Sequence, residues 1–324
     1  MASRDPDWRP TASLDVLRLR AELLVRIRAF FATRGVLEVE TPVLSAAAAP
    51  DPHLTSPVTR LTAAGGGTFY LHTSPEYPMK RLLAAGYGDI WQLCRVFRDG
   101  ERGARHNPEF TLLEWYRIGF DHHTLMNEVS ALLRQVLDGH LELGADERLT
   151  YREAFRRHAG LDPFEATDET LRAAVQRLGG ETRGLARDAL LDFLGGHVVY
   201  PALGHGRPTF LYDFPASQAA LARVRDDDPA VAERFEVFVD GIELANGYHE
   251  LADAREQRAR FERHNRERAA AGLPVMPLDE RLLAALAHGL PDCAGVALGF
   301  DRLVMLAAGA RRIEEVIAFP VERA

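Results

Sequence analysis

The segment from Arg95 to Arg117 constrains the fold most strongly, because its pattern predicts two strands joined by a long charged loop. Exposed ion pairs are each worth only about 0 to 1 kcal/mol, so a plain surface hairpin has little need of many arginines. A guanidinium on a rigid strand pair can instead bind two oxygens of a phosphate or carboxylate. The loop carries three arginines: Arg98, Arg102 and Arg105. The segment therefore indicates either a solvated hairpin or a site for a polyanion.

Composition limits the possible functions. The chain has 324 residues, of which 47% are hydrophobic, enough for one large or two modest domains. Its 39 basic and 47 acidic residues give a net charge of -8, which argues against broad nucleic-acid binding. Cys94 and Cys293 are too few for a disulfide framework or a cysteine zinc site, as expected in a reducing cytosol. With no apolar run of 18 residues, we expect a cytoplasmic protein.

The N-terminal third predicts two helices. Ser13 can cap a long amphipathic helix that Gly35 closes, and a short strand over 36–39 follows. The apolar face of that helix indicates packing either within one subunit or against a second chain. Further on, a strand over 68–72 precedes a helix with Ser74 as its cap and Pro75 as its first residue, ending near Gly86.

The middle of the chain is predicted to be mainly helical. After a helix over 125–137, residues 140–205 read as a helical insertion, with helices over 151–158, 168–178 and 187–194. Thr150 and Glu153 have the spacing of a capping box. The insertion can serve stability alone or contact a macromolecular partner.

The segment 233–251 alternates apolar and polar residues and is predicted to form a hairpin that turns at Asp240-Gly241. Its acids, among them Glu236, Glu243 and Glu250, indicate either a solvated face or ligands for a magnesium-nucleotide complex. The charged helix predicted over 252–271 is expected to be a solvated surface. In the last strand-helix unit, we expect Asp301 to cap the helix that bears Arg302.

Three stretches, in order, resemble the motifs of class II aminoacyl-tRNA synthetases of the lysyl branch. GVLEVETPVL, with its proline at Pro42, looks like motif 1. RVFRDGERGARHNPEF followed by TLLEWY looks like motif 2, and GVALGFDRLVMLA, with Arg302, looks like motif 3. The resemblance implies an α+β fold: one catalytic domain over 1–324 with an antiparallel sheet flanked by helices and the insertion at 140–205. It also implies a homodimer joined through the first helix.

The resemblance further implies activation of an amino acid by ATP with Mg²⁺. Two anions must meet, so fixed positive charge and alignment matter more than proton transfer. Arg98 would bridge the substrate carboxylate and the α-phosphate, and Arg302 would hold the β/γ end; these two are the expected catalytic residues. The acids expected to hold metal are Glu236 and Glu243. The residues expected to bind ATP are Arg98, Asp99, Gly100, Arg105, His106, Asn107, Phe110, Glu243, Leu244, Gly299 and Arg302.

Substrate identity follows from matching charge. A buried ammonium is costly unless it is paired, so several acids around one small molecule predict a dicationic substrate such as lysine or an isomer. In the family pattern Glu250 and Tyr116 clamp the side chain, while Glu76 and Glu114 lie near an amino group. The residues expected to bind the amino acid are Ser74, Pro75, Glu76, Glu114, Tyr116, Asn246, Glu250 and Ala297.

Two positions depart from the lysyl pattern. Gly100 stands where motif 2 usually has the glutamate that reads adenine, so either Glu101 reaches the adenine or the backbone makes that contact. Ala297 stands where lysyl-tRNA synthetases have glycine. Its extra methyl group is expected to reshape the pocket floor and to disfavour ordinary α-lysine.

The acceptor is inferred from what precedes motif 1. The 34 residues before Gly35 are too few for an anticodon-binding OB barrel, so no anticodon recognition is expected. The chain is most similar to the elongation factor P-lysine ligases, which activate (R)-β-lysine with ATP and pass it to a lysine of elongation factor P. Two alternatives remain open: a stand-alone synthetase that charges tRNA or releases lysyl-adenylate, and an inactive paralog acting as a binding subunit.

Overall fold

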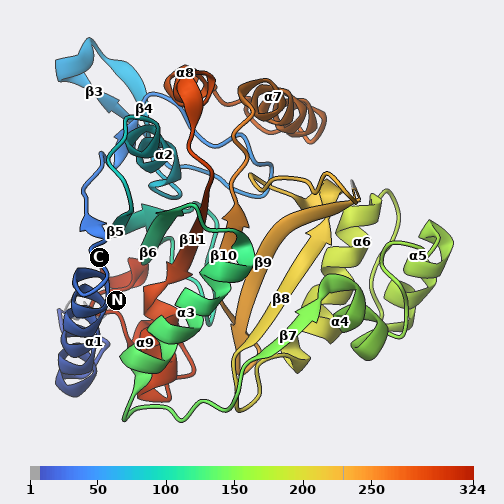
Figure 1. The fold of residues 1–324 in the computed structure, drawn as a ribbon, viewed down its shortest axis with the longest axis horizontal. Coiled ribbons are helices and arrows are strands. Elements are labelled where there is room, and N and C mark those ends of the chain that lie inside the picture. The colour runs from blue at the N-terminus through green and yellow to red at the C-terminus, as the bar shows by residue number, and fades with distance from the viewer. Residues whose placement is uncertain (1–7, 229) are drawn as a thin grey trace, which may run out of the picture.

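The computed structural model describes residues 8–228 and 230–324, so residues 1–7 of the expected catalytic domain lie outside the described range. Its centre is an eight-stranded sheet (Figure 1). In order across the sheet the strands are β1 (Leu37–Glu38), β5 (Ile90–Phe97), β6 (Glu109–Ile118), β11 (Cys293–Gly299), β10 (Ile242–His249), β9 (Val231–Val239), β8 (Thr209–Pro215) and β7 (Glu147–Thr150). The middle six strands pair antiparallel, as predicted, whereas β1 and β7 run parallel to their neighbours at the two edges.

The predicted hairpins are confirmed. β5 and β6 pair from Ile90↔Tyr116 to Phe97↔Glu109, with the arginine-bearing loop between them. β9 and β10 turn at Asp240-Gly241, both at positive φ, which matches the right-handed twist of the strands they join. A second, three-stranded sheet contains β2 (Leu44–Ser45), β4 (Gly67–Leu71) and β3 (Val58–Leu61). The strand predicted over 68–72 is β4, whereas its partner β3 was not predicted.

One face of the large sheet is covered by α1 (Leu14–Ala32), α3 (His122–Leu137) and α9 (Phe300–Ala308), which share the main apolar core with it. Ser13 caps α1 by accepting a hydrogen bond from the Val16 amide. The buried side chains of α1 pack in this core, while Leu14 and Val25 on the same helix are mostly exposed. Part of the predicted apolar face, including Ile27 and Phe31, thus packs within the chain. The segment before α1 meets the C-terminal segment, because the Thr11 amide donates to the Ala318 carbonyl.

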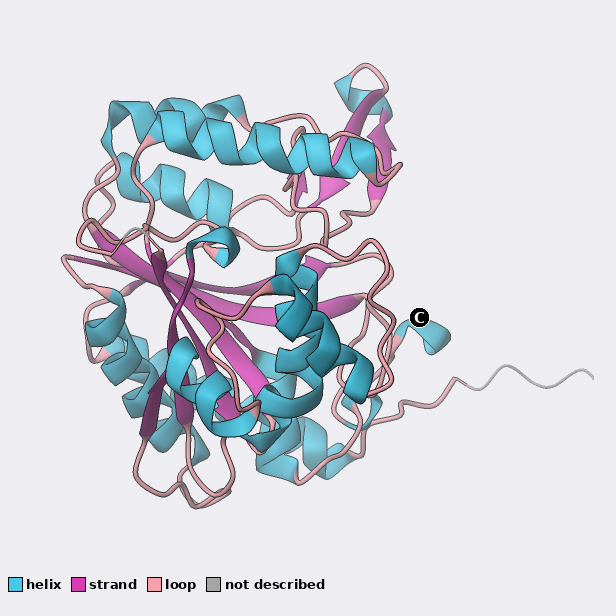
Figure 2. Cartoon of the chain, turned by 90° about the vertical axis from the view of Figure 1, so that its right-hand side faces the viewer, coloured by secondary structure: helices cyan, strands magenta, loops and turns pink. Residues whose placement is uncertain are grey.

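A separate cluster forms where α2 (Glu76–Ala84), α7 (Ala254–Ala270) and α8 (Glu280–Gly289) pack together. Figure 2 shows, in one view, helices lying on more than one side of the strands. The prediction that the charged helix is simply solvated is wrong for one face of α7. Arg268 is fully buried and donates to the carbonyls of Pro274, Asp51 and Leu54, which anchors the irregular loop after β2.

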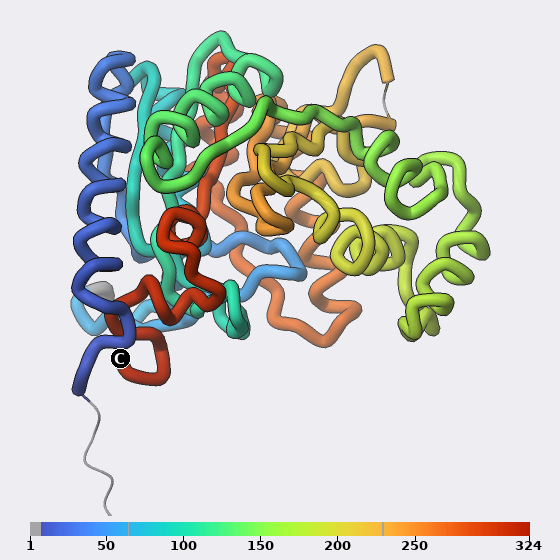
Figure 3. Tube along the Cα trace, turned by 90° about the horizontal axis from the view of Figure 1, so that it is seen from below, coloured from blue at the N-terminus to red at the C-terminus, as the bar shows by residue number. Residues whose placement is uncertain are grey.

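Residues 140–205 contain β7 and the helices α4 (Tyr151–His158), α5 (Asp168–Arg177) and α6 (Arg187–Leu194), within one residue of the predicted bounds. Thr150 and Glu153 form the predicted capping box. These helices enclose an apolar cluster of their own against β8 and β9. Figure 3 shows them at the opposite end of the molecule from α1.

The expected role of Asp301 as a helix cap is wrong. α9 begins at Phe300 after Gly299, and Asp301 makes no cap because it lies inside the first turn. Its buried carboxylate instead accepts hydrogen bonds from the Thr111 amide at 2.6 Å and from Arg20 at 2.5 Å. The residue therefore ties α1, β6 and α9 together. Within residues 8–228 and 230–324, no helix combines the length and apolar character needed to cross a bilayer.

Candidate active site

The strand register sets the floor of the site. Two rows of side chains cross β6, β11, β10 and β9. The first row reads Glu114, Ala297, Asn246 and Glu236, and the second, two residues along each strand, reads Tyr116, Gly295, Tyr248 and Arg234. Residues two apart on a strand face the same side, so both rows lie on one face of the sheet. A cavity of about 950 Å³ opens over this face.

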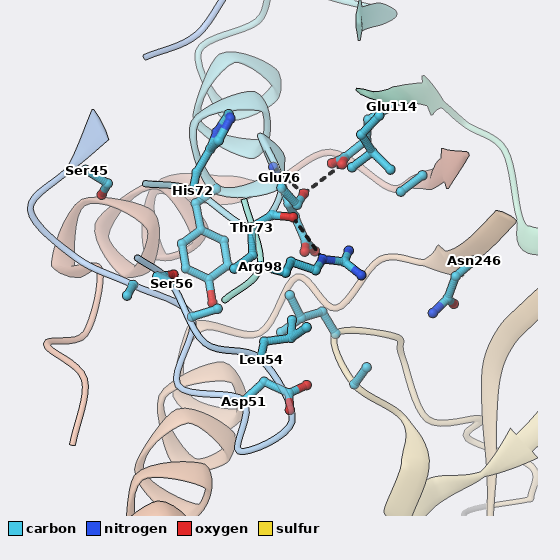
Figure 4. A pocket seen from close by; sticks show the side chains of 18 of the residues that line it. Ser45, Asp51, Leu54, Ser56, His72, Thr73, Glu76, Arg98, Glu114 and Asn246 are labelled. Atoms are coloured by element: carbon cyan, nitrogen blue, oxygen red, sulfur yellow. Dashed lines mark hydrogen bonds between the residues drawn. The ribbon is translucent and has the colours of Figure 1, made fainter. Parts of the chain in front are cut away.

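Most of the predicted site residues line this one cavity. They are Ser74, Glu76, Arg98, Arg105, His106, Asn107, Phe110, Glu114, Tyr116, Glu243, Leu244, Asn246, Glu250, Ala297, Gly299 and Arg302. Figure 4 shows Glu76, Arg98 and Asn246 directed into a shared space. Pro75, Asp99, Gly100 and Glu236 are not among the lining residues, whereas Glu101 is, and it lies 3.5 Å from Arg98.

One end of the cavity gathers guanidinium groups. The Arg98 guanidinium lies 5.1 Å from the centre of the Phe110 ring and donates to the Thr73 carbonyl. Arg302 donates to the Glu243 carbonyl at 2.7 Å and contacts Nε2 of His106 at 2.7 Å. Burial and the Arg302 charge lower the pKa of His106, so its neutral ring accepts this hydrogen bond. Backbone carbonyls and a neutral ring thereby orient the arginines, and their nearest carboxylates lie no closer than 3.5 Å for Arg98 and 3.7 Å for Arg302.

The other end gathers buried acids. Glu114 accepts hydrogen bonds from Ser74 Oγ at 2.7 Å and from the Tyr116 hydroxyl at 2.6 Å. Burial and the charge of Glu76 raise the pKa of Glu114 to about 8. Burial also raises the pKa of Glu250, to about 7. Acids whose pKa is raised this far favour the binding of an added cation, such as an ammonium group.

Lys80 was not recognised from the sequence. It is almost fully buried on α2, and its Nζ lies 2.6 Å from both Glu76 and Glu250. Burial disfavours the charged ammonium, but Glu250 and Glu76 outweigh this and raise the pKa of Lys80. Two signals were available: Lys80 stands four residues after Glu76 on a helix, and it is the chain's single lysine.

Arg234 is the second residue that was missed. Arg234 lies two residues before Glu236 on β9, so both side chains are on the cavity face of the sheet. Its guanidinium lies 2.6 Å from Glu236 and donates to the Gln218 carbonyl at 2.6 Å and to the Asn246 side-chain oxygen at 3.3 Å. Asn246 therefore presents its amide nitrogen to the cavity.

The donor chemistry of Glu236 and Glu243 fits a divalent cation. The two carboxylates come from neighbouring strands, and Glu243 is 43% exposed, 3.7 Å from Arg302. Burial raises the pKa of Glu236 to about 7, opposed by Arg234 and reinforced by the charge of Glu243. Hard carboxylate oxygens beside a phosphate site are the ligands that Mg²⁺ prefers, and one or two are sufficient when a nucleotide supplies the rest.

Gly295 is required by a close approach in the floor. A Cβ at this position would lie 2.3 Å from the Tyr116 ring and 2.5 Å from Glu250 Oε1. Gly299 is different, because a Cβ there would meet only ordinary contacts of 3.6 Å with Arg302. The glycine at 295 therefore allows the phenol and the carboxylate to approach the backbone of β11.

Comparisons with known proteins identify the family to which the chain belongs. Residues 1–323 match the family described as tRNA synthetases class II (D, K and N). The chain is 54% identical to proteins of Salmonella paratyphi B and Salmonella schwarzengrund that carry the name elongation factor P–(R)-beta-lysine ligase, over 99% of this chain and all of each relative. The similarly named protein of Salmonella heidelberg matches to the same extent. The chain therefore belongs to the class II tRNA synthetase family of the D, K and N group.

Proposed function

We propose that this chain activates (R)-β-lysine, or lysine, with ATP and transfers it to a lysine side chain of elongation factor P. Family membership and the names of relatives at 54% identity support this reaction. The observation that carries it most is the division of one cavity into a guanidinium end and a carboxylate end, 950 Å³ in all. Such a cavity suits two reactants, one polyanionic and one polycationic.

Activation joins the substrate carboxylate to the α-phosphorus of ATP, and pyrophosphate leaves. Arg98 would bridge the two reacting anions, while Arg302 and Arg105 would hold the β/γ end of the triphosphate. Phe110, beneath the Arg98 guanidinium, would stack on adenine. The arginines are positioned before the nucleotide arrives, so little reorganisation is needed as negative charge develops in the transition state.

Mg²⁺ bound near Glu236 and Glu243 would neutralise phosphate charge that the arginines leave uncompensated. Glu236 would exchange part of its contact with Arg234 for the cation. Its raised pKa, caused by burial and opposed by Arg234, supports this role, since a nearby dication favours the ionised carboxylate.

The carboxylate end would bind the two ammonium groups of the amino acid. Glu250 and Tyr116 would hold the side-chain ammonium, and Glu76 and Glu114 would hold the other. Lys80 already neutralises one of the negative charges, so the net charge offered matches a dication more closely than the three acids alone would. Ala297 lies between Glu114 and Asn246 in its row. Its methyl group, which the glycine of lysyl-tRNA synthetases lacks, would favour β-lysine over α-lysine.

We further propose that residues 1–324 act as one catalytic domain with the helical insertion at 140–205. The domain is proposed to work as a cytoplasmic homodimer. The family resemblance supports dimerisation through α1, whose Leu14 and Val25 remain exposed in the single chain. Sedimentation at working concentration tests this, and a monomer with full activity would contradict it.

ATP-pyrophosphate exchange tests the first half of the reaction. We expect exchange with (R)-β-lysine to exceed that with α-lysine. Mass spectrometry of elongation factor P and of tRNA, each incubated with the enzyme and substrates, tests the second half. Charging of tRNA alone would favour the stand-alone synthetase, and no exchange with any amino acid would favour an inactive paralog.

A further inference from the structure

A second group of ligand-type side chains lies on the face of the sheet opposite the cavity. His249, at the end of β10, and Glu233, on β9, alternate with the cavity residues Glu250 and Arg234 and so point the other way. His122, the first residue of α3, meets them there. One ligand atom from each of His122, Glu233 and His249 lies within 4.8 Å of the other two. Two imidazoles and one carboxylate therefore converge from three elements.

The described residues supply no hydrogen-bond partner for the buried ring of His122. The residue is only 4% exposed, and neither ring nitrogen has a hydrogen-bond partner. Its closest acid is Asp213, whose Oδ1 lies 3.6 Å from Nε2 and is itself buried without a hydrogen bond. An unsatisfied buried polar group destabilises the fold, and here two such groups face each other. A ligand that completed their coordination would remove this cost.

Each histidine also has a carboxylate on its Nε2 side. Asp213 faces Nε2 of His122, and Asp292 lies 3.0 Å from Nε2 of His249. Metal-binding histidines usually donate the second ring N–H to such an acid, which fixes the tautomer and leaves the other nitrogen as the ligand. On His249 that other nitrogen, Nδ1, is the one in contact with Glu233. Asp213 has positive φ at a bulge in β8, which redirects its side chain.

The simpler reading is an ion-paired histidine without metal. In that case a protonated His249 forms ion pairs with both Glu233 and Asp292, and Arg223 forms a further ion pair with Asp292 at 2.6 Å. Arg225 lies 3.3 Å from Asp213. This reading accounts for His249 but leaves both nitrogens of His122 unsatisfied. Metal coordination accounts for both histidines at once.

We propose that His122, His249 and Glu233 bind one divalent transition-metal ion of the zinc type, with Asp213 and Asp292 orienting the two imidazoles. Two nitrogen ligands and one oxygen ligand suit Zn²⁺, leaving a fourth position for water, and disfavour Mg²⁺ and Ca²⁺, which take oxygen ligands. The ion would join the start of α3 to the start of β9 and the end of β10. The ion would lie near the end of β10, on the face of the sheet opposite the cavity that holds Glu250 and the reacting groups.

The test uses the full chain stripped of metal by a chelator and titrated with Zn²⁺ or Co²⁺. We expect one equivalent of Zn²⁺ to bind and to raise the melting temperature. We expect one equivalent of Co²⁺ to give the visible absorption of a four-coordinate site. A wild-type chain with neither saturable Zn²⁺ binding nor that absorption overturns the proposal without any variant.

Matched variants then locate the site. His122→Met replaces the imidazole with an apolar side chain of similar reach and so removes the nitrogen ligand. It should weaken Zn²⁺ binding by more than the roughly 10- to 100-fold expected for loss of an outer partner. Asp213→Asn should show that smaller effect. His123→Met, an exposed neighbour on the same turn, is the control and should bind as wild type. Unchanged binding in His122→Met, or equal loss in His123→Met, overturns the assignment.

Discussion

Replacement of Lys80 by methionine removes the ammonium group that contacts both Glu76 and Glu250, while keeping an unbranched side chain. Each carboxylate oxygen lies 2.6 Å from Nζ, so the two oxygens are separated by at most twice 2.6 Å, or 5.2 Å. Two unit charges at this separation repel by about 3 kcal/mol at an effective dielectric constant near 20. Removing one partner of a buried ion pair typically costs about 3 to 5 kcal/mol. We therefore expect Lys80→Met to lower the free energy of unfolding by about 3 to 5 kcal/mol near pH 8.

The loss should depend on pH in a defined direction. Burial raises the pKa of Glu250 to about 7 even though Lys80 opposes the rise, so the pKa in the variant must lie higher still. A carboxyl whose folded-state pKa exceeds its unfolded value binds a proton more tightly in the folded state, and stability falls as pH rises between the two values. The difference between Lys80→Met and wild type should thus be small near pH 5 and largest above pH 8.

Urea unfolding followed by tryptophan fluorescence, at several pH values, measures this difference. Arg255→Met, which removes an exposed cation from α7, is the control and should change stability by less than about 0.5 kcal/mol. Adding Glu76→Gln to Lys80→Met should recover much of the loss, because one of the two repelling charges is removed. A loss below about 1 kcal/mol that is equal at pH 5 and pH 8 would refute the reasoning.

Four further outcomes follow from the site. Arg302→Ala should reduce ATP-pyrophosphate exchange by roughly 100- to 1,000-fold or more with little change in unfolding, and global unfolding would count against its placement. Ala297→Gly should raise α-lysine use relative to β-lysine, by up to roughly 10- to 200-fold; an unchanged ratio would show that this methyl does not shape the pocket. Gly295→Ala should cost about 1 to 3 kcal/mol and raise the KM for the amino acid, since its Cβ would displace Glu250; wild-type kinetics would contradict the close approach. Because burial holds the pKa of Glu250 near 7 and that of Glu114 near 8, ammonium binding at neutral pH should release protons and strengthen as pH rises from 6 to 8; calorimetry in two buffers of different ionisation enthalpy would show no proton release if the account is wrong.

Local patterns in the sequence predicted much of the fold. The β5–β6 and β9–β10 hairpins, the capping box at Thr150 and the helices of the insertion depend on neighbouring residues, so alternation, turn residues and caps were sufficient. The parallel pairings of the edge strands β1 and β7 join segments far apart in the sequence, which periodicity does not reveal. β3 pairs with β4, the next strand along the chain, and was missed because its 4 residues give too short a pattern. Asp301 was assigned to a cap because its carboxylate's true partners, Arg20 and Thr111, lie far away in the chain.

The site was predicted where side chains match a family motif and was missed where burial contradicts the usual behaviour of charge. Arg268 was assigned to a solvated helix and Lys80 was not singled out, because most lysines and arginines are exposed. Both are buried, since carboxylates or backbone carbonyls surround them. Only the folded arrangement shows that Lys80 offsets part of the acid cluster at the substrate end.

The most direct test of the proposed function is the mass of elongation factor P after incubation with this chain, ATP, Mg²⁺ and (R)-β-lysine. The account predicts that the acceptor gains one lysyl residue on a single lysine side chain, with AMP formed in equal amount, and that Arg98→Ala abolishes the gain. An unmodified acceptor in the presence of active pyrophosphate exchange would contradict transfer to this protein. An unmodified acceptor without exchange would contradict the activation chemistry itself.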